Sequence, residues 1–259
     1  MIHRSAVIET GAVIGDNVRI GPFCFIGKKA KIANNCIFHS NVVIDGDAEI
    51  GNNTELSPFS SIGTIPQDLK YAGEKTKVFI GDNCKIREYV TVNIGTNGGG
   101  RITRVGNNCL LMVGTHIAHD CNIGNDVIFA NHSTLAGHVT IEDKAVIGAL
   151  SAIHQFTRIG EGSMIGGMSG VTNDVIPFGT VVGNRAKLSG LNIVGLRRRK
   201  IKKKEINELR KVFKYIFFDK KNTFKLRVEK IIAENYKSYT VQKLIDFLLD
   251  DSERSFCLP

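Results

Sequence analysis

Apolar residues recur at every sixth position along most of this chain. The series occupies residues 8–62, 80–92 and, after a slip of one position, 105–171. A small residue usually stands two places before the large apolar one, which puts both side chains on the same face of a short strand. A repeat this short and this long-lived predicts a solenoid of stacked strands.

The residues between the apolar positions predict corners. Glycine often follows the apolar residue, and asparagine or aspartate often follows the glycine, as in Gly15-Asp16-Asn17. Because these residue types tolerate a positive φ, we expect each hexad to be a short strand followed by a turn. Three hexads would close one triangular coil of 18 residues. The pattern resembles the hexapeptide-repeat proteins, which are left-handed parallel β-helices and largely acyltransferases, so we expect a mainly β protein with that fold.

Two segments interrupt the hexads, and we expect both to leave the prism as loops. Residues 64–77 read TIPQDLKYAGEKTK and leave the apolar phase unchanged, since Ile80 follows Ile62 by 18 positions. Residues 93–103 contain three consecutive glycines and shift the phase by one. Loops that leave a rigid scaffold are common places for functional residues.

The periodicity becomes helical after the repeat fades. Apolar residues within 201–217 fit one amphipathic helix, Thr223 can cap a second, and Thr240 can cap a third. We therefore expect a β-helix over residues 1–190 and a small helical domain over residues 191–259.

Composition narrows the class of protein. The N-terminal residues lack the apolar segment of a signal peptide, and no apolar run approaches the roughly 18 residues of a membrane helix. We expect a cytoplasmic protein without stable membrane insertion. Five of the six cysteines occupy the small position of the hexad, which favours buried fillers over disulfides or metal ligands.

The net charge of +9 is unevenly distributed. Residues 197–204 read RRRKIKKK, whereas the repeat region is much closer to neutral. Such a run could attract nucleic acid, an acidic protein or anionic small molecules, or could simply be a solvated helix start. We expect no nucleic acid, because no aromatic platform or reading motif accompanies it.

The 18-residue coil, used as a ruler, brings several polar residues together. Four of the five histidines in the later coils form a candidate cluster, and none occupies the large apolar position: His116, His119, His138 and His154. One coil beyond His119 lies Gly137, and one coil further lies Gln155. Asp120 precedes His138 by the same step. We expect these residues to converge on one corner of neighbouring coils.

This cluster suits proton transfer. A neutral imidazole can accept a proton near pH 7, so His119 could act as a general base with Asp120 orienting it. The N–H of Gly137 could face a developing oxyanion. Zinc is the competing interpretation, because carbonic anhydrases of this fold class place two histidines five positions apart. Here His116 and His119 are three apart, so we expect no metal. Histidines on a repetitive surface can also be incidental, and we interpret His132 as structural or incidental.

Four stretches carry a closer resemblance: residues 67–71 (QDLKY), 116–121 (HIAHDC), 135–138 (LAGH) and 153–156 (IHQF). They resemble the UDP-N-acetylglucosamine O-acyltransferases of lipid A biosynthesis, and the resemblance covers essentially the whole chain. It implies transfer of an (R)-3-hydroxyacyl group from acyl carrier protein to the glucosamine 3-hydroxyl of UDP-GlcNAc, without a cofactor. By the family pattern His119 is the general base, Asp120 its partner and Gly137 the oxyanion donor.

The resemblance also implies binding residues. Those for the sugar, diphosphate or acyl chain are Asp68, Lys70, His116, His138, His154 and Gln155. Those for the nucleotide diphosphate are Asn192, Arg198 and Arg199. Met164 and Gly167 match positions that measure acyl length, and a glycine there favours a longer hydroxyacyl chain. Val194 stands where some members carry glutamate, so nucleotide affinity is expected to be weaker or carried by the backbone.

The resemblance further implies an assembly. The family is trimeric with sites between neighbouring prisms, so we expect a homotrimer. Acyl carrier proteins are acidic and UDP carries a diphosphate, which gives the basic run of residues 197–204 two candidate partners.

Two other functions remain open. A related UDP-sugar N-acyltransferase would acylate an amine, and a few relatives use a 3-amino sugar. The N-acyltransferases of the same pathway carry an extra uridine-binding domain before the prism, whereas the hexads here begin at Ile8. A non-catalytic scaffold that docks an acidic partner would not depend on His119. The polar QDLKY loop beside a histidine corner argues against it.

Overall fold

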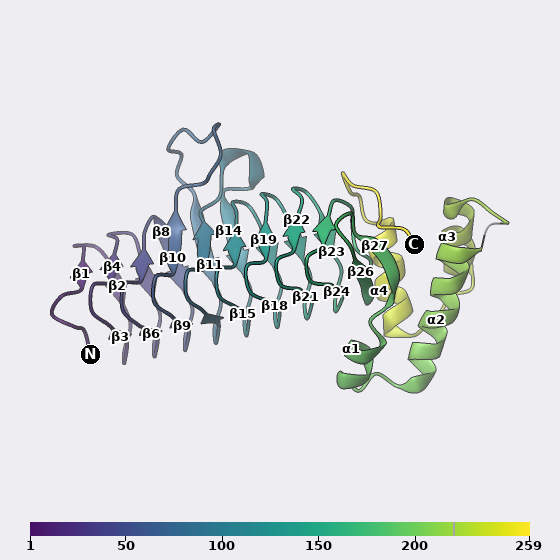
Figure 1. Cartoon of the computed structure of the whole chain (residues 1–259), viewed down its shortest axis with the longest axis horizontal. Helices are drawn as coiled ribbons and strands as arrows, with labels where there is room; N and C mark the ends of the chain where they lie inside the picture. The colour runs from purple at the N-terminus through teal and green to yellow at the C-terminus, as the bar shows by residue number, and fades with distance from the viewer. Residues whose placement is uncertain (220) are drawn as a thin grey trace.

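The computed structural model describes residues 1–219 and 221–259 and shows a long rod that ends in a group of helices (Figure 1). Within this part of the chain the strands form three sheets, parallel throughout except for the last strand pair. The sheets wind into a left-handed β-helix with a small helical C-terminal part, which confirms the expected fold. No helix in the described residues is both long and apolar enough to cross a membrane.

Each coil before the last contributes one strand to each sheet. The first sheet consists of β1 (Val7–Ile8), β4 (Phe25–Ile26), β7 (Val43–Ile44), β10 (Ser61–Thr64), β13 (Thr91–Asn93), β16 (His116–Ile117), β19 (Thr134–Leu135), β22 (Ala152–Ile153) and β25 (Gly170–Val171). The second consists of β2 (Val13–Ile14), β5 (Lys31–Ile32), β8 (Asp47–Ile50), β11 (Lys77–Ile80), β14 (Ile102–Val105), β17 (Asn122–Ile123), β20 (Thr140–Ile141) and β23 (Arg158–Ile159). The third consists of β3 (Arg19–Ile20), β6 (Ile37–Phe38), β9 (Glu55–Leu56), β12 (Lys85–Ile86), β15 (Leu110–Leu111), β18 (Ile128–Phe129), β21 (Val146–Ile147), β24 (Met164–Ile165), β26 (Gly179–Val182) and β27 (Lys187–Leu191).

The register of the coils follows the 18-residue spacing except at the two interruptions and at the last coil, where Met164 pairs with Thr180, 16 positions along. His116 pairs with Thr134, 18 positions along, as regular coils require. Ser61 pairs with Thr91 across the first interruption, 30 positions along, and Thr91 pairs with His116 across the second, 25 positions along. The unchanged phase at Ile80 therefore does not mark a whole coil. Ile80 lies in β11 of the second sheet, one strand beyond Ile62.

The large apolar residue of each hexad points into the prism. Ile26, Ile44 and Ile62 are stacked in the first sheet and are fully buried. The residue two places earlier is small and also buried, and five of the six cysteines stand there, all unpaired in the described part of the chain. The interpretation of these cysteines as fillers is confirmed.

The corners differ from the expectation in one respect. The positive φ falls on the third residue after the apolar one, as at Asn17 (φ 58°), rather than on the glycine. A Cβ on Gly15 would collide with Asn34 of the next coil. The glycine is required because neighbouring coils approach closely there, and the asparagine makes the turn.

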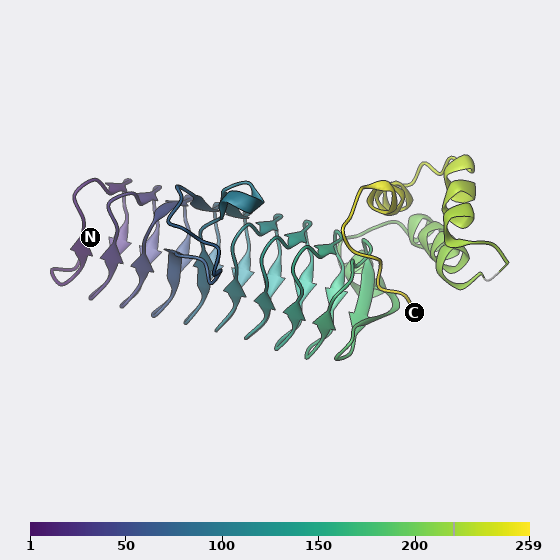
Figure 2. The same ribbon diagram turned by 90° about the horizontal axis from the view of Figure 1, so that it is seen from above.

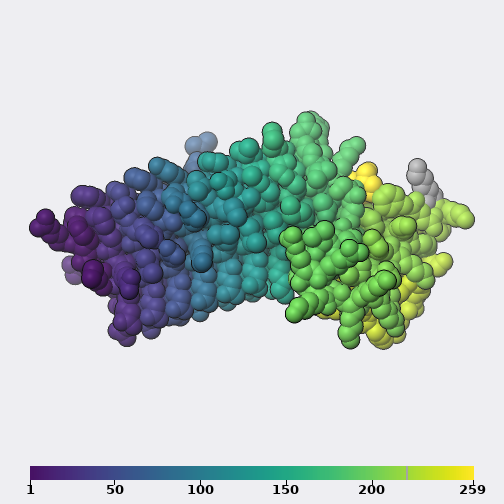
Figure 3. All heavy atoms as spheres, turned by 60° about the horizontal axis from the view of Figure 1, so that its bottom comes forward, coloured from purple at the N-terminus to yellow at the C-terminus, as the bar shows by residue number. Residues whose placement is uncertain are grey.

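The helical part follows the last coil (Figure 2). It contains α1 (Ile193–Arg198), α2 (Lys203–Phe218), α3 (Phe224–Ala233) and α4 (Tyr239–Leu249), and Figure 3 shows it as a lobe at the end of the rod. Thr223 caps α3 as expected, accepting a hydrogen bond from the N–H of Leu226. The prediction for the last helix was wrong: its N-cap is Ser238, and Thr240 is buried inside it. β27 and the short α1 were not anticipated.

Candidate active site

The two interrupting loops and the histidine cluster all lie at one corner of the prism, the corner between the first and second sheets. The first loop joins β10 to β11, the second joins β13 to β14, and His119 stands between β16 and β17. Figure 1 shows the two loops projecting from the same side of the rod. Because the strands of consecutive coils are neighbours in each sheet, the loops and the histidines are stacked along one edge of the prism.

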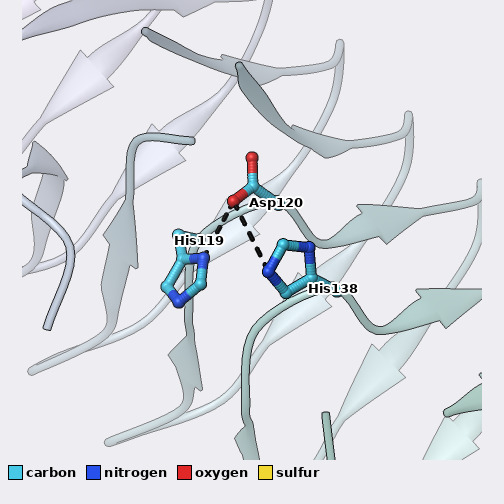
Figure 4. Close-up of side chains that lie close together, drawn as sticks. All are labelled: His119, Asp120 and His138. Atoms are coloured by element: carbon cyan, nitrogen blue, oxygen red, sulfur yellow. Dashed lines mark hydrogen bonds and ion pairs between the residues drawn. The ribbon is translucent and has the colours of Figure 1, made fainter. Parts of the chain in front are cut away.

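His119 and Asp120 form a hydrogen-bonded pair at this corner (Figure 4). Nδ1 of His119 lies 2.8 Å from Oδ2 of Asp120, whose side chain is fully buried. The second loop supplies further donors, because the N–H of Thr96 lies 2.9 Å from Oδ1 and its hydroxyl lies 2.6 Å from Oδ2. Thr96 and His119 both donate to Asp120, so the carboxylate acts as an acceptor that fixes the imidazole of His119.

The backbone holds Asp120 in place. Asp120 occupies the positive-φ corner position (φ 58°), and its N–H donates to the hydroxyl of Thr103 over 2.9 Å. The second loop passes so close that a Cβ on Gly99 would lie 2.5 Å from Oδ2 of Asp120. The run of glycines in this loop therefore allows the backbone to approach the carboxylate.

The next coils build a wall beside the pair. A Cβ on Gly137 would lie 2.7 Å from Nε2 of His119, so the missing side chain provides the space for that ring. His138 stands edge-on to His119 with ring centroids 5.1 Å apart, and its Nε2 lies 4.0 Å from Oδ2 of Asp120. One coil further, Phe156 stacks on His138 at 4.5 Å.

Burial changes the acid–base properties of two neighbouring histidines. Loss of water around His138 lowers its pKa, although the Asp120 carboxylate acts in the opposite direction. Burial also lowers the pKa of His116, and the nearby His119 adds to the effect. The Nδ1 atom of His116 lies 2.7 Å from the hydroxyl of Thr91. Both rings are thus held in the neutral form near pH 7, in which they can donate and accept hydrogen bonds.

A cavity of about 940 Å³ lies over these residues. His116, His119, Gly137, His138, His154 and Gln155 line it from the prism, and Asp68 and Lys70 line it from the first loop. The loop turns on itself because the N–H of Lys70 donates to Oδ1 of Asp68 over 2.9 Å. The volume suits a small-molecule substrate, and the lining combines apolar walls with a few polar groups.

The same corner could offer ligand atoms to a metal ion. Atoms of His119, Asp120 and His138 lie within 4.8 Å of one another. However, Oδ2 of Asp120 already accepts hydrogen bonds from His119 and from Thr96. A metal would have to displace these donors, so the arrangement fits a proton-transfer pair better than a metal centre.

Several residues expected at the site lie elsewhere on the chain. Arg199 bonds to the carbonyl of Gly162 and faces Glu161 at 3.6 Å, at the corner between the second and third sheets. Asn192 caps α1 and also bonds to Gly162. Arg198 and Val194 are exposed on α1. Met164 lies in the third sheet, and Gly167 lies at the corner between the third and first sheets. Neither residue lines the cavity.

Sequence reasoning missed several residues that shape the site. Thr96 and Thr103 bond to Asp120, and Thr91 bonds to His116, but the loops shift their separations away from multiples of 18. Phe156 was detectable, because it stands one coil beyond His138. The C-terminal segment also reaches the site, where Arg254 contacts His154. A separation of 100 residues left no signal for that contact.

The fold and the site together define a hexapeptide-repeat transferase. Residues 102–137 match the family model "Bacterial transferase hexapeptide (six repeats)". Residues 174–257 match "Udp N-acetylglucosamine O-acyltransferase; Domain 2".

Curated relatives and solved structures narrow the family. The chain is 42% identical to an acyl-[acyl-carrier-protein]–UDP-N-acetylglucosamine O-acyltransferase of Campylobacter concisus over 96% of this chain and 94% of that protein. It is 47% identical to the protein of the same name from Aliarcobacter butzleri, covering 96% and 95%. The solved UDP-N-acetylglucosamine acyltransferase of Campylobacter jejuni superposes with a TM-score of 0.94 at 42% identity and full coverage of both chains. The chain belongs to the acyl-[acyl-carrier-protein]–UDP-N-acetylglucosamine O-acyltransferase family.

Proposed function

We propose that the protein transfers an (R)-3-hydroxyacyl group from acyl carrier protein to the glucosamine 3-hydroxyl of UDP-GlcNAc, the first step of lipid A biosynthesis. One observation carries the proposal: the His119–Asp120 pair opens onto a cavity of about 940 Å³. Family membership supplies the reaction, and this corner supplies groups able to perform it.

In this mechanism His119 is the general base. Because Nδ1 is engaged with Asp120, Nε2 is the nitrogen left to accept the proton of the sugar hydroxyl. The hydroxyl oxygen attacks the thioester carbonyl of the acyl donor. The N–H of Gly137 donates to the oxyanion that forms. When the tetrahedral intermediate collapses, the C–S bond breaks and His119 returns the proton to the leaving thiolate.

The substrate contacts follow from the cavity. We assign the sugar, diphosphate and acyl chain to Asp68, Lys70, His116, His138, His154 and Gln155, all of which line it. The lowered pKa values of His116 and His138 support this role, because neutral rings can bind uncharged hydroxyl and amide groups.

We further propose that the working unit is a homotrimer and that a neighbouring copy completes each site. Asn192, Arg198, Arg199, Met164 and Gly167 lie off the cavity of their own chain, so a second copy is needed to bring them there. An exposed apolar ridge supports such contact: Phe23, Phe59, Tyr89, Leu150 and Met168 stand at the corner between the third and first sheets, each at least 50% exposed. Asn41, Gly114 and His132 interrupt the row, but exposed apolar side chains gathered along one edge are typical of surfaces that contact a partner.

The remaining proposals concern the partner and the compartment. Apart from the half-buried Arg199, the cations of residues 197–204 are exposed, which supports docking of the acidic acyl carrier protein there. Six cysteines without disulfides in the described residues support a reducing compartment, the cytoplasm. Gly167 adds no side-chain bulk, which supports a longer hydroxyacyl chain.

The test is an assay of the purified protein with UDP-GlcNAc and hydroxyacyl carrier proteins of graded chain length. Mass spectrometry should detect UDP-GlcNAc carrying an ester on the 3-hydroxyl, with the longer chains transferred fastest. Acylation of a 3-amino sugar in preference to UDP-GlcNAc would instead support the related N-acyltransferase. Absence of acylation with every chain would favour a scaffold.

A further inference from the structure

The C-terminal segment that follows α4 reaches the catalytic corner. The guanidinium of Arg254 makes two contacts there. Its Nη2 lies 2.9 Å from Nδ1 of His154, and its Nε donates to the carbonyl oxygen of Gln155 over 3.1 Å. Arg254 therefore contacts His154 and Gln155, two adjacent residues of the cavity wall, although it does not itself line the cavity.

A buried carboxylate anchors this segment to the prism. Asp174 is fully buried and accepts from the hydroxyl of Ser252 over 2.6 Å and from Nε of Arg158 over 2.8 Å. Its backbone pairs with the segment on both sides, through the carbonyl of Ser255 and the N–H of Cys257. These bonds flank Arg254 and hold its backbone beside the last coils.

The contact with Arg254 selects one form of the His154 ring. A guanidinium has only donors, so Nδ1 of His154 must be the acceptor and the ring hydrogen must sit on Nε2. Nδ1 also lies 3.3 Å from the carbonyl oxygen of Gln155, an acceptor that would otherwise favour the opposite tautomer. Since Arg254 engages that same carbonyl, it removes the competing preference.

We propose that Arg254 is a positioning residue for acyl transfer, acting through the ring of His154. It holds His154 in the tautomer whose Nε2–H can donate to an oxygen of the bound sugar nucleotide or acyl chain. The substrate side of this inference depends on the proposed function, whereas the tautomer does not.

The tautomer can be measured without substrate. In long-range proton–nitrogen NMR spectra of the full-length protein, His154 should show a protonated Nε2 and an unprotonated Nδ1. Arg254→Met keeps an apolar stem but removes the donors, so it should yield a mixture of tautomers. Arg254→Lys keeps one donor and should retain more of the native form. A single Nε2–H tautomer that persists unchanged in Arg254→Met would overturn the proposal.

Kinetics test whether the tautomer matters. Arg254→Met should lower kcat/KM roughly ten- to a hundredfold, as expected when a binding group is misplaced. The same substitution in a His154→Ala background should have little further effect, because its route of action is gone. An equal loss in both backgrounds would mean that Arg254 only stabilises the fold. Arg19→Met makes the same change at an exposed arginine of the early coils, so it is the matched control and should retain full activity.

The two failures are distinguishable. If the wild-type protein acylates no sugar nucleotide but the NMR result holds, the proposed function fails and the positioning role of Arg254 stands. If transfer occurs and Arg254→Met matches the wild type in rate and tautomer, the positioning role fails alone. Thermal unfolding and sizing of each variant ensure that folded assemblies are compared.

Discussion

At the residue scale, the proposed proton transfer depends on a short chain of hydrogen bonds. Thr96 donates to Asp120, and Asp120 accepts from Nδ1 of His119, which leaves Nε2 directed away from the carboxylate. Gly137 leaves room for the ring of His119, because a Cβ at this position would collide with it. The proposed general base, His119, is thus oriented before the substrate arrives.

Asp120→Asn tests this orientation. An amide can offer its N–H rather than an oxygen to His119 and so favour the wrong tautomer, and we expect kcat to fall by about 10²–10⁴-fold with the fold intact. Steady-state kinetics with UDP-GlcNAc and acyl carrier protein check the prediction. Asp126→Asn makes the same change at another positive-φ corner (φ 57°) and should leave turnover unchanged. A fall below tenfold at Asp120 would contradict the assigned role.

The lowered pKa of His138 predicts a pH dependence of stability. At a pH just below the ordinary histidine pKa of 6.5, burial keeps the His138 ring unprotonated in the folded state. In the unfolded chain the same ring binds a proton at that pH. The free energy of unfolding should therefore decrease as the pH falls below about 6.5. His138→Asn should reduce this decrease in urea titrations at pH 7.5 and 5.5. His132→Asn places the same residue at a matching φ and measures the backbone contribution. An unchanged pH slope in His138→Asn would contradict the prediction.

At the scale of elements, the two loops and the His119 corner of the next coil together form the site. The prism supplies rigid edges, and the loops add the groups that a short hexad cannot provide. Asp68 and Lys70 come from the first loop and Thr96 from the second. Since both loops replace the corner between the first and second sheets, they stack directly before His119.

Gly99→Ala tests the packing of the second loop. Its Cβ would collide with the Asp120 carboxylate, so the loop must move and Thr96 must lose its hydrogen bonds. We expect kcat to fall tenfold or more, a rough figure for a displaced catalytic group, while the prism stays folded. At Gly98 the nearest atom to a Cβ is 4.0 Å away, so Gly98→Ala is the matched control. Steady-state kinetics and thermal unfolding of both variants check the prediction. Equal activities of Gly99→Ala and Gly98→Ala would contradict the packing argument.

The sequence predicted those parts of the structure that repeat. The hexads specify the three sheets, and the 18-residue ruler placed His119 beside Gly137 and Asp120 beside His138, because regular pairing leaves no freedom. Contacts made by the loops and by the C-terminal segment were not predictable. Thr96 and Arg254 reach the corner through tertiary packing, which no periodicity records. The cap of α4 was missed because Ser238 and Thr240 are both capping residues, and packing buries the second.

At the scale of the whole molecule, one chain holds the proton-transfer pair but not all expected binding residues on a single surface. Arg198 lies on α1, beyond the last coil, and Met164 lies on the third sheet, away from the cavity. A threefold assembly would let one chain's cavity face another chain's third sheet and α1. The exposed ridge between the third and first sheets provides apolar area for such contact.

Mixed assemblies test this arrangement. His119→Ala and Arg198→Glu should each inactivate or strongly impair the homotrimer. If each site uses His119 from one chain and Arg198 from its neighbour, random mixing of the two variants restores about a quarter of the sites. Refolding the variants together and measuring acyl transfer checks the prediction. No recovery would place both residues in one chain's site, since every chain in the mixture carries one defect.

The most direct test of the central claim is acyl transfer by His119→Ala. The purified variant and the wild-type protein would be given UDP-GlcNAc and a hydroxyacyl carrier protein that the wild type uses, and the acylated nucleotide would be quantified by mass spectrometry. We predict a loss of about 10²–10⁴-fold in rate with unchanged thermal unfolding, because the general base is gone and the prism remains. Near-normal turnover by a folded His119→Ala variant would contradict the account.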